Sequence, residues 1–105
     1  MARMDAMFQK MVEANASDLH LTIGNKPLIR SKGALVPLAE YILTQEVLEG
    51  LLFETMSPDQ WNTASTRHDF DYAYEVPGLA RFRGNIFYNH QGIASVFRTV
   101  SGFEA

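Results

Sequence analysis

The segment 79–89 alternates between apolar and polar side chains, and this alternation constrains the fold more than any other feature of the sequence. Successive side chains of an extended strand point to opposite faces of a sheet. One face of this segment therefore carries Phe82, Gly84, Ile86 and Tyr88, and we predict that this face packs into the core. The opposite face carries both arginines of the segment, Arg81 and Arg83.

A second strand is predicted at 92–100, directly after the turn at His90 and Gln91. If that turn contains two or four residues, Gly84 faces Phe97 across the hairpin, and a small side chain against a large one suits a packed core. The same register places Arg83 opposite Arg98. Because two guanidinium groups across a ladder repel each other, this pairing is expected only where acids or a bound anion neutralise it.

A third strand is predicted at Asp69–Val76, joined to the segment 79–89 by Pro77 and Gly78. A two-residue turn there would place Asp69 and Asp71 on the core face. A loop one residue longer or shorter instead restores the aromatic side chains to the core. We therefore expect a β-bulge at this connection, with these residues facing the core: Phe70, Tyr72 and Tyr74.

With the aromatic residues inside, Asp71 and Glu75 share the face that carries the arginines. The two carboxylates can then neutralise Arg81 and Arg83 in a surface network of modest value for stability. From the pattern alone, this structural interpretation is favoured over an anion-binding site.

The remainder of the chain predicts an α+β domain. A helical stripe of apolar residues runs from Met4 to Val12, and short extended segments follow at 18–23, 27–31 and 34–38. Two further helices are predicted after the capping residues Thr44 and Ser57, the second with proline at its first position and glutamine at its third. The order helix, three strands, two helices, three strands favours a mostly antiparallel sheet with helices packed against it.

Composition excludes several classes of function. A length of 105 residues suits one domain, and the formal net charge of −3 has the wrong sign for a domain that binds nucleic acid through its phosphates. The absence of cysteine removes disulfides, thiolate nucleophiles and cysteine-based metal sites. The sequence contains no apolar stretch of the roughly 20 residues that cross a bilayer.

Sequence motifs for independent catalysis are missing from the chain. It contains neither a phosphate loop, a dinucleotide fingerprint nor a hydrolase elbow, so we expect no ATP hydrolysis by these 105 residues alone. The three histidines, His20, His68 and His90, are widely separated, and we expect no metal site. The pair Asp18 and His20 is predicted to be a structural hydrogen-bonded pair rather than an acid–base catalyst.

Three blocks of the sequence resemble, in order and spacing, the N-terminal segments of the type IV pilus retraction ATPases, the PilT-like branch of the secretion ATPases. The first block begins with Ala-Ser-Asp-Leu-His-Leu (16–21) and continues through Gly24, Pro27, Ile29, Arg30 and Gly33. The second contains Asp-Phe-Asp-Tyr (69–72) and Val-Pro-Gly-Leu-Ala-Arg-Phe-Arg-Gly-Asn (76–85), and the third is Val-Phe-Arg-Thr (96–99). Family members more often have two prolines where this chain has Lys26 and Pro27.

The resemblance implies that residues 1–105 form a PAS-like N-terminal domain and that the RecA-like C-terminal ATPase domain is absent from this chain. It implies a hexameric ring in which this domain packs on the nucleotide-binding domain of the neighbouring subunit. ATP and Mg²⁺ are expected in the full-length protein, and no cofactor is expected in this fragment. The implied location is cytoplasmic and peripheral to the inner membrane, with the pilus inner-membrane platform as a further partner and no role for nucleic acid.

The resemblance also implies a role for the arginines, because arginines of the last strands approach the nucleotide phosphates in this family. The matching positions are Arg81, Arg83 and Arg98, and we expect catalytic contacts from Arg83 and Arg98 once the ATPase domain is present. Arg81 is expected either to contact the nucleotide or to be structural. Two alternatives remain: a stand-alone PAS-like domain that senses a ligand, and an assembly adaptor whose arginines pair with Asp71 and Glu75.

Overall fold

The apolar stripe at the start of the chain forms helix α1 (Arg3–Glu13) in a computed structural model, which describes residues 3–100. Asn15 ends the helix in the left-handed conformation, with a φ of 55°. The backbone N–H of Asn15 donates to the carbonyl of Val12, and that of Ala16 donates to the carbonyl of Met11. These two hydrogen bonds form a Schellman motif. Its left-handed position is occupied here by asparagine, one of the few residues that tolerate a positive φ.

The two predicted capping residues begin helices α2 (Gln45–Phe53) and α3 (Pro58–Arg67). The hydroxyl of Thr44 accepts a hydrogen bond from the backbone N–H of Val47 at 3.2 Å. Ser57 and Gln60 form the predicted capping box, in which each side chain accepts a hydrogen bond from the other residue's backbone N–H. Both predictions are confirmed because capping depends on local sequence alone.

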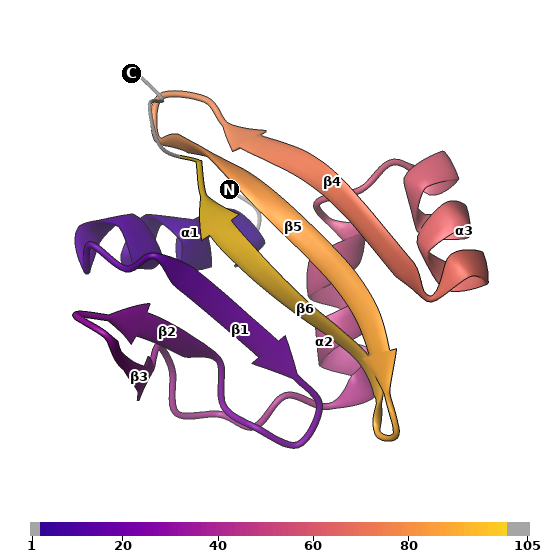
Figure 1. The fold of residues 1–105 in the computed structure, drawn as a ribbon, viewed down its shortest axis with the longest axis horizontal. Helices are drawn as coiled ribbons and strands as arrows, with labels where there is room; N and C mark the ends of the chain where they lie inside the picture. The colour runs from indigo at the N-terminus through magenta and orange to yellow at the C-terminus, as the bar shows by residue number, and fades with distance from the viewer. Residues whose placement is uncertain (1–2, 101–105) are drawn as a thin grey trace.

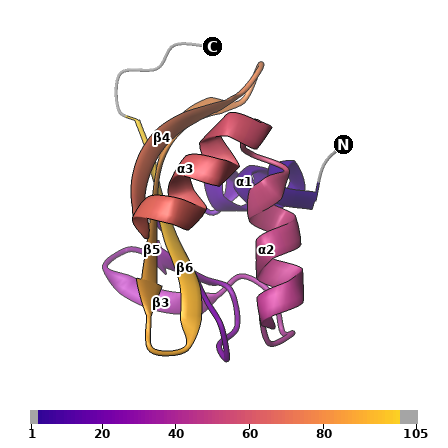
Figure 2. The ribbon, with the colours of Figure 1, turned by 90° about the vertical axis from the view of Figure 1, so that its right-hand side faces the viewer.

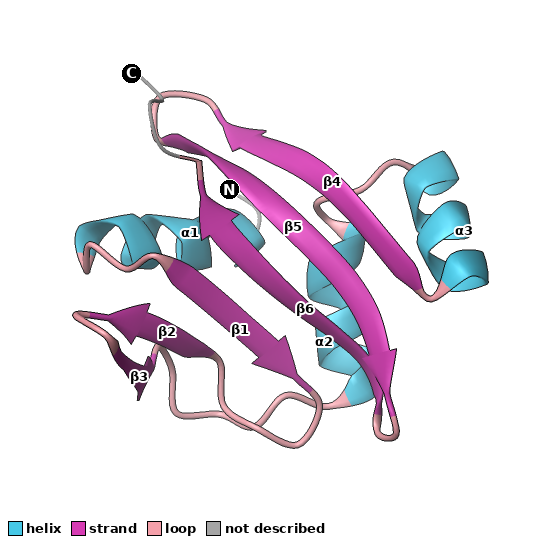
Figure 3. Cartoon of the chain, in the orientation of Figure 1, coloured by secondary structure: helices cyan, strands magenta, loops and turns pink. Residues whose placement is uncertain are grey.

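Six strands form one antiparallel sheet in the order β3-β2-β1-β6-β5-β4, as Figures 1 and 3 show. The first and last strands in sequence therefore meet at the centre of the sheet, where β1 pairs with β6. The single domain of six antiparallel strands and three helices confirms the α+β class. The strands are β1 (Asp18–Thr22), β2 (Leu28–Ser31), β3 (Ala34–Pro37), β4 (Asp69–Val76), β5 (Ala80–Asn89) and β6 (Gly92–Thr99).

The register of the last hairpin agrees with the sequence prediction. Asn89 pairs with Gly92, so the turn contains two residues, and Gly84 faces Phe97 as expected. The connection from β4 to β5 is different, because the expected bulge is wrong. Pairing is continuous from Asp69–Phe87 to Val76–Ala80, and a three-residue loop sets the correct face without a bulge. The odd loop length, rather than an extra residue inside the strand, restores the aromatic side chains to the core.

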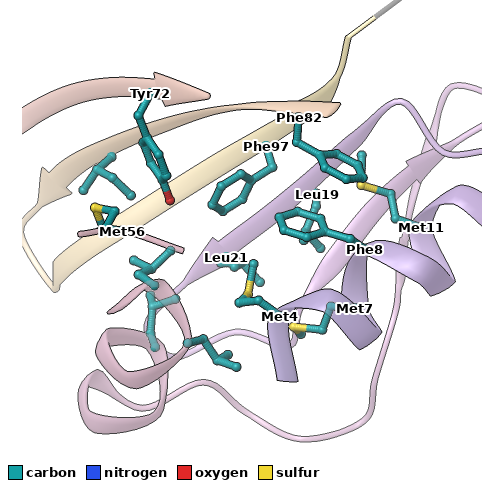
Figure 4. Packing of buried hydrophobic residues seen from close by; sticks show 14 of the residues in the cluster. Met4, Met7, Phe8, Met11, Leu19, Leu21, Met56, Tyr72, Phe82 and Phe97 are labelled. Carbon is teal, nitrogen blue, oxygen red and sulfur yellow. The ribbon is translucent and has the colours of Figure 1, made fainter. Parts of the chain in front are cut away.

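The three helices lie on one side of the sheet, and the core fills the space between (Figure 2). Figure 4 shows Phe8 of α1 pointing toward the sheet, where its ring stacks on that of Phe82 with 4.1 Å between ring centroids. The ring of Phe97 meets the Phe8 ring edge-on at 5.1 Å. Within this core, the hydroxyl groups of Thr55 and Tyr72 form a hydrogen bond, and burial raises the pKa of Tyr72 well above its usual range.

Polar contacts tie the first turn of α1 to the rest of the domain. The Glu54 carboxylate accepts hydrogen bonds from the backbone N–H of Met4 at 3.0 Å and from Nε of Arg3 at 2.9 Å. Tyr74 donates its hydroxyl proton to the carboxylate of Asp5 at 2.7 Å, and burial together with this hydrogen bond raises the pKa of Tyr74 to about 12. The contact with Met4 satisfies one of the backbone donors that have no partner inside the helix.

Stability at acidic pH is predicted to depend on Glu54. Burial raises the pKa of this carboxyl, but the hydrogen bonds from Met4 and Arg3 and the Arg3 charge outweigh it, so the folded-state pKa lies below the ordinary value of 4.5. A lowered pKa stabilises the fold above the unfolded-state pKa, and this contribution is lost as pH falls through the folded-state pKa. We expect wild type to exceed Glu54→Gln in the free energy of unfolding at pH 7, by up to about 1 kcal/mol, and the difference to shrink below pH 4.5. Urea unfolding at pH 7 and pH 3 measures this difference, and an equal difference at both values would contradict the prediction.

Candidate functional site

The face of the sheet opposite the helices carries the three predicted arginines. Alternation along β5 places Arg81 and Arg83 on this face while Phe82 and Gly84 point into the core. Arg98 lies on the same face of β6, and all three arginine residues are exposed. We call this surface the bare face, because no helix or strand within residues 3–100 covers it (Figure 2).

Arg83 and Arg98 lie directly opposite each other across the β5–β6 ladder, as predicted. On its other side, Arg83 pairs with Ala73 of β4, which offers no charge. Within residues 3–100, the Arg83 guanidinium forms no hydrogen bond or ion pair. Two cations are therefore held side by side, and one of them has no counter-ion in the described part of the chain.

A hollow of about 330 Å³ lies between these two arginines on the bare face. It is lined by Asp71, Arg83, Gly84, Asn85, Val96 and Arg98. The carboxylate of Asp71 accepts a hydrogen bond from Nδ2 of Asn85 at 2.7 Å. The expected ion pair between Asp71 and Arg83 is therefore wrong: Asn85 lies directly across the ladder from Asp71 and donates to its carboxylate instead.

Arg81 is held by the other predicted acid. Its Nη2 donates to the Glu75 carboxylate at 3.2 Å, from the residue directly opposite in β4. Both side chains are about half exposed, so solvent screens the pair and its contribution to stability is small. Arg81 thus fits the structural role that the pattern allowed, whereas Arg83 does not.

Arg98 has an acidic neighbour that sequence reasoning missed. Its Nε lies 3.7 Å from Oδ2 of Asp18, the residue opposite it in β1. The predicted hydrogen bond between Asp18 and His20 is wrong: Oδ2 of Asp18 lies 3.7 Å from Nε2 of His20, which is too long for a hydrogen bond, and this buried nitrogen has no hydrogen-bond partner within residues 3–100. Alternation along β1 signals that Asp18 lies on a polar face, but no local signal shows that β1 pairs with β6.

This arrangement is suited to binding an anion. Two guanidinium groups provide several N–H donors and two positive charges around one shallow hollow, and guanidinium forks match the oxygens of phosphate or carboxylate. In the described range 3–100, no three His, Asp or Glu residues gather as metal ligands. Over the same residues, every helix is too short or too polar to cross a membrane.

Relatives with known names match most of the chain. The type IV pilus retraction ATPase PilT of Pseudomonas aeruginosa is 36% identical over 85 residues, which are 81% of this chain and 25% of that protein. The type IV pilus ATPase PilU of the same organism is 26% identical over 91% of this chain and 25% of its own length. A twitching motility protein of Neisseria gonorrhoeae is 30% identical over 70% of this chain and 20% of its own length. The chain spans about a quarter of the length of the curated relatives it matches.

Solved structures of related ATPases also match this chain. A crystal structure of the pilus retraction motor PilT with bound ADP matches 100% of this chain and 31% of its own, with a TM-score of 0.84 and 27% identity. The ATPase DotB of Legionella pneumophila matches 92% of this chain and 28% of its own, with a TM-score of 0.81 and 25% identity. A search with models of protein families finds no match.

The fold and these matches define the class first: the chain is an α+β N-terminal domain of a secretion ATPase. Within that class it belongs with the PilT-like ATPases, whose named members carry out pilus retraction and twitching motility. The resemblance noted from the three sequence blocks is thereby confirmed.

Proposed function

We propose that this chain is the N-terminal domain, residues 1–105, of a hexameric pilus-retraction ATPase. In this proposal the domain packs on the nucleotide-binding domain of the neighbouring subunit and turns its bare face toward the ATP phosphates. The observation that carries the proposal is the Arg83–Arg98 pair, in which two cations face each other and Arg83 has no counter-ion within residues 3–100. An anion from outside the domain would relieve that repulsion.

The residues of the bare face fit phosphate groups rather than a whole nucleotide. Arg83 and Arg98 donate hydrogen bonds and supply positive charge, and both stabilise the charge that spreads over a phosphoryl group during transfer. The residues that hold ATP and Mg²⁺ belong, in this proposal, to the C-terminal ATPase domain. This chain alone is then not an enzyme.

The proposed mechanical role follows from the position of the domain between subunits. Nucleotide binding moves the domain as a rigid body, and closure of the ring transmits force to the pilus base, which couples ATP hydrolysis to pilus disassembly. The partners are the ATPase domains of the same and neighbouring subunits and the pilus inner-membrane platform. The full-length protein is placed in the cytoplasm, peripheral to the inner membrane.

One observation favours the adaptor alternative, in which the bare face only supports assembly. Arg81 is paired with Glu75 at 3.2 Å, as a structural arginine would be. A stand-alone adaptor or sensor requires that no ATPase domain accompany these residues.

Reading the source coding sequence beyond Ala105 separates these functions. We expect a G-x-x-x-x-G-K-[ST] phosphate loop to follow, because the relatives extend well beyond the region that this chain matches. A stop codon directly after Ala105 would contradict the motor proposal and leave the adaptor and the sensor.

A further inference from the structure

Asp18 lies between two arginines in the row of charged residues that crosses the bare face. It lies in β1, with Arg30 of β2 opposite it on one side and Arg98 of β6 opposite it on the other. Its side chain is only 16% exposed, although the face has no covering layer within residues 3–100. Because β1 is paired along both edges, the backbone of Asp18 is held in place by the sheet.

Of the two flanking arginines, only Arg98 lies within ion-pair distance of this carboxylate in residues 3–100. Nη1 of Arg30 donates to the backbone carbonyl of Gly33 at 3.2 Å, so this guanidinium contacts the β2–β3 turn. Arg98 instead presents its Nε to Oδ2 of Asp18 at 3.7 Å. Contact through Nε leaves the two terminal nitrogens of Arg98, with their four N–H donors, available to an incoming anion.

Arg98 and Arg83 also differ in the residues that lie opposite them. The place that Asp18 occupies beside Arg98 is taken by Ala73 beside Arg83, so no carboxylate lies directly opposite Arg83 in the described part of the chain. The negative charge of Asp18 also reduces the repulsion between the two guanidinium groups, which otherwise favours their separation. Arg98 therefore has a carboxylate within ion-pair distance, although its side chain is 71% exposed, whereas Arg83 has no ion-pair or hydrogen-bond partner within residues 3–100.

We propose that Asp18 is the positioning residue for Arg98: it holds the Nε edge of the guanidinium so that the terminal nitrogens face the phosphate. This inference rests on the proposed function, since it assigns a role within the same phosphate-facing surface. Asp18 itself does not contact the phosphate. It acts by restricting the side chain of Arg98 before the anion arrives, which lowers the entropy lost on binding.

The first test uses the 105-residue chain and needs no nucleotide. The heteronuclear ¹⁵N NOE of each arginine Nε–H reports side-chain motion on the picosecond to nanosecond timescale. We expect a higher value for Arg98 than for Arg83 in the wild type, and a fall of the Arg98 value to that of Arg83 in Asp18→Asn. Equal values for the two arginines in the wild type would overturn the proposal, even if Asp18→Asn failed to fold.

The second test measures ATP turnover in the full-length protein for Asp18→Asn, Arg98→Ala and the double variant. We expect Asp18→Asn to lower kcat on the order of two- to fivefold, as for an exposed ion pair, with no further loss in the Arg98→Ala background. Asp69→Asn is the matched control, because it removes a carboxylate from the same face where the neighbour is Asn85.

The outcomes distinguish the proposed contact of Arg98 with phosphate from the proposed positioning role of Asp18. If Arg98→Ala turns over ATP at the wild-type rate, the proposed contact of Arg98 with phosphate is wrong. If Arg98→Ala is impaired but Asp18→Asn matches the control, only the positioning role is overturned. Additive losses in the double variant would likewise overturn it, because Asp18 would then act independently of Arg98.

Discussion

Replacing Arg83 by alanine in the proposed full-length ATPase is expected to lower ATP turnover by at least about 100-fold, the loss typical of removing one donor to developing charge. The physical reason is the isolation of this side chain: within residues 3–100 it has no counter-ion, and its neighbour across the ladder is another arginine. A guanidinium in that position contributes little to folding and is available to an external phosphate. The measurement is steady-state phosphate release at saturating ATP.

The controls for this prediction separate charge, geometry and fold. Arg83→Lys keeps the charge but loses the planar fork, so we expect a turnover between those of wild type and Arg83→Ala. Arg67→Ala removes an exposed arginine from α3, on the side of the sheet opposite the bare face, and we expect it to match wild type. Urea unfolding of the 105-residue chain is expected to give the same midpoint for Arg83→Ala and wild type. Wild-type turnover in Arg83→Ala would end the proposal that this arginine meets phosphate.

Gly84→Ala is expected to destabilise the domain by about 2–3 kcal/mol, near the upper end of the usual range for overpacking a core. A Cβ at this position would lie 2.6 Å from Cε1 of Phe97 and 3.0 Å from Cε1 of Tyr72. Neither ring is free to withdraw, because Phe97 is fully buried against Phe8 and the Tyr72 hydroxyl is bonded to Thr55. The free energy of unfolding in urea, from the midpoint and slope, measures the effect.

The matched control makes the same chemical change in a helix. At Gly50 of α2, the nearest atom to an added Cβ is the flexible end of the Arg3 side chain, and alanine has the higher helix propensity. We therefore expect Gly50→Ala to leave stability unchanged or to raise it by up to about 1 kcal/mol. Phe97→Leu in the Gly84→Ala background is expected to restore part of the loss. Equal stability of Gly84→Ala and wild type would show that the glycine–phenylalanine contact does not limit the core.

Much of the candidate site followed from local sequence, because strand alternation and turn length are both short-range properties. The placement of Arg83 opposite Arg98 needed only the two-residue turn between β5 and β6 and the demand that Gly84 meet Phe97. The ion pair between Glu75 and Arg81 followed from the same alternation. The local argument predicted a β-bulge between β4 and β5, and the structure has a three-residue loop instead. Both arrangements bring Tyr72 into the core, so side-chain alternation does not distinguish them.

The sequence by itself determined the elements, their capped ends, the register within the last hairpin and the face on which the arginines lie. These depend on hydrogen bonds and side-chain alternation between residues close together in the chain. Only the tertiary structure decided that β1 lies beside β6, which brings Asp18 to Arg98 over a sequence separation of 80 positions. That pairing depends on how the whole core packs beneath the sheet, and no local sequence pattern predicts it. The same packing places Ala73 beside Arg83 and the Asp18 carboxylate beside Arg98. The two arginines therefore differ in whether an acidic residue lies opposite them.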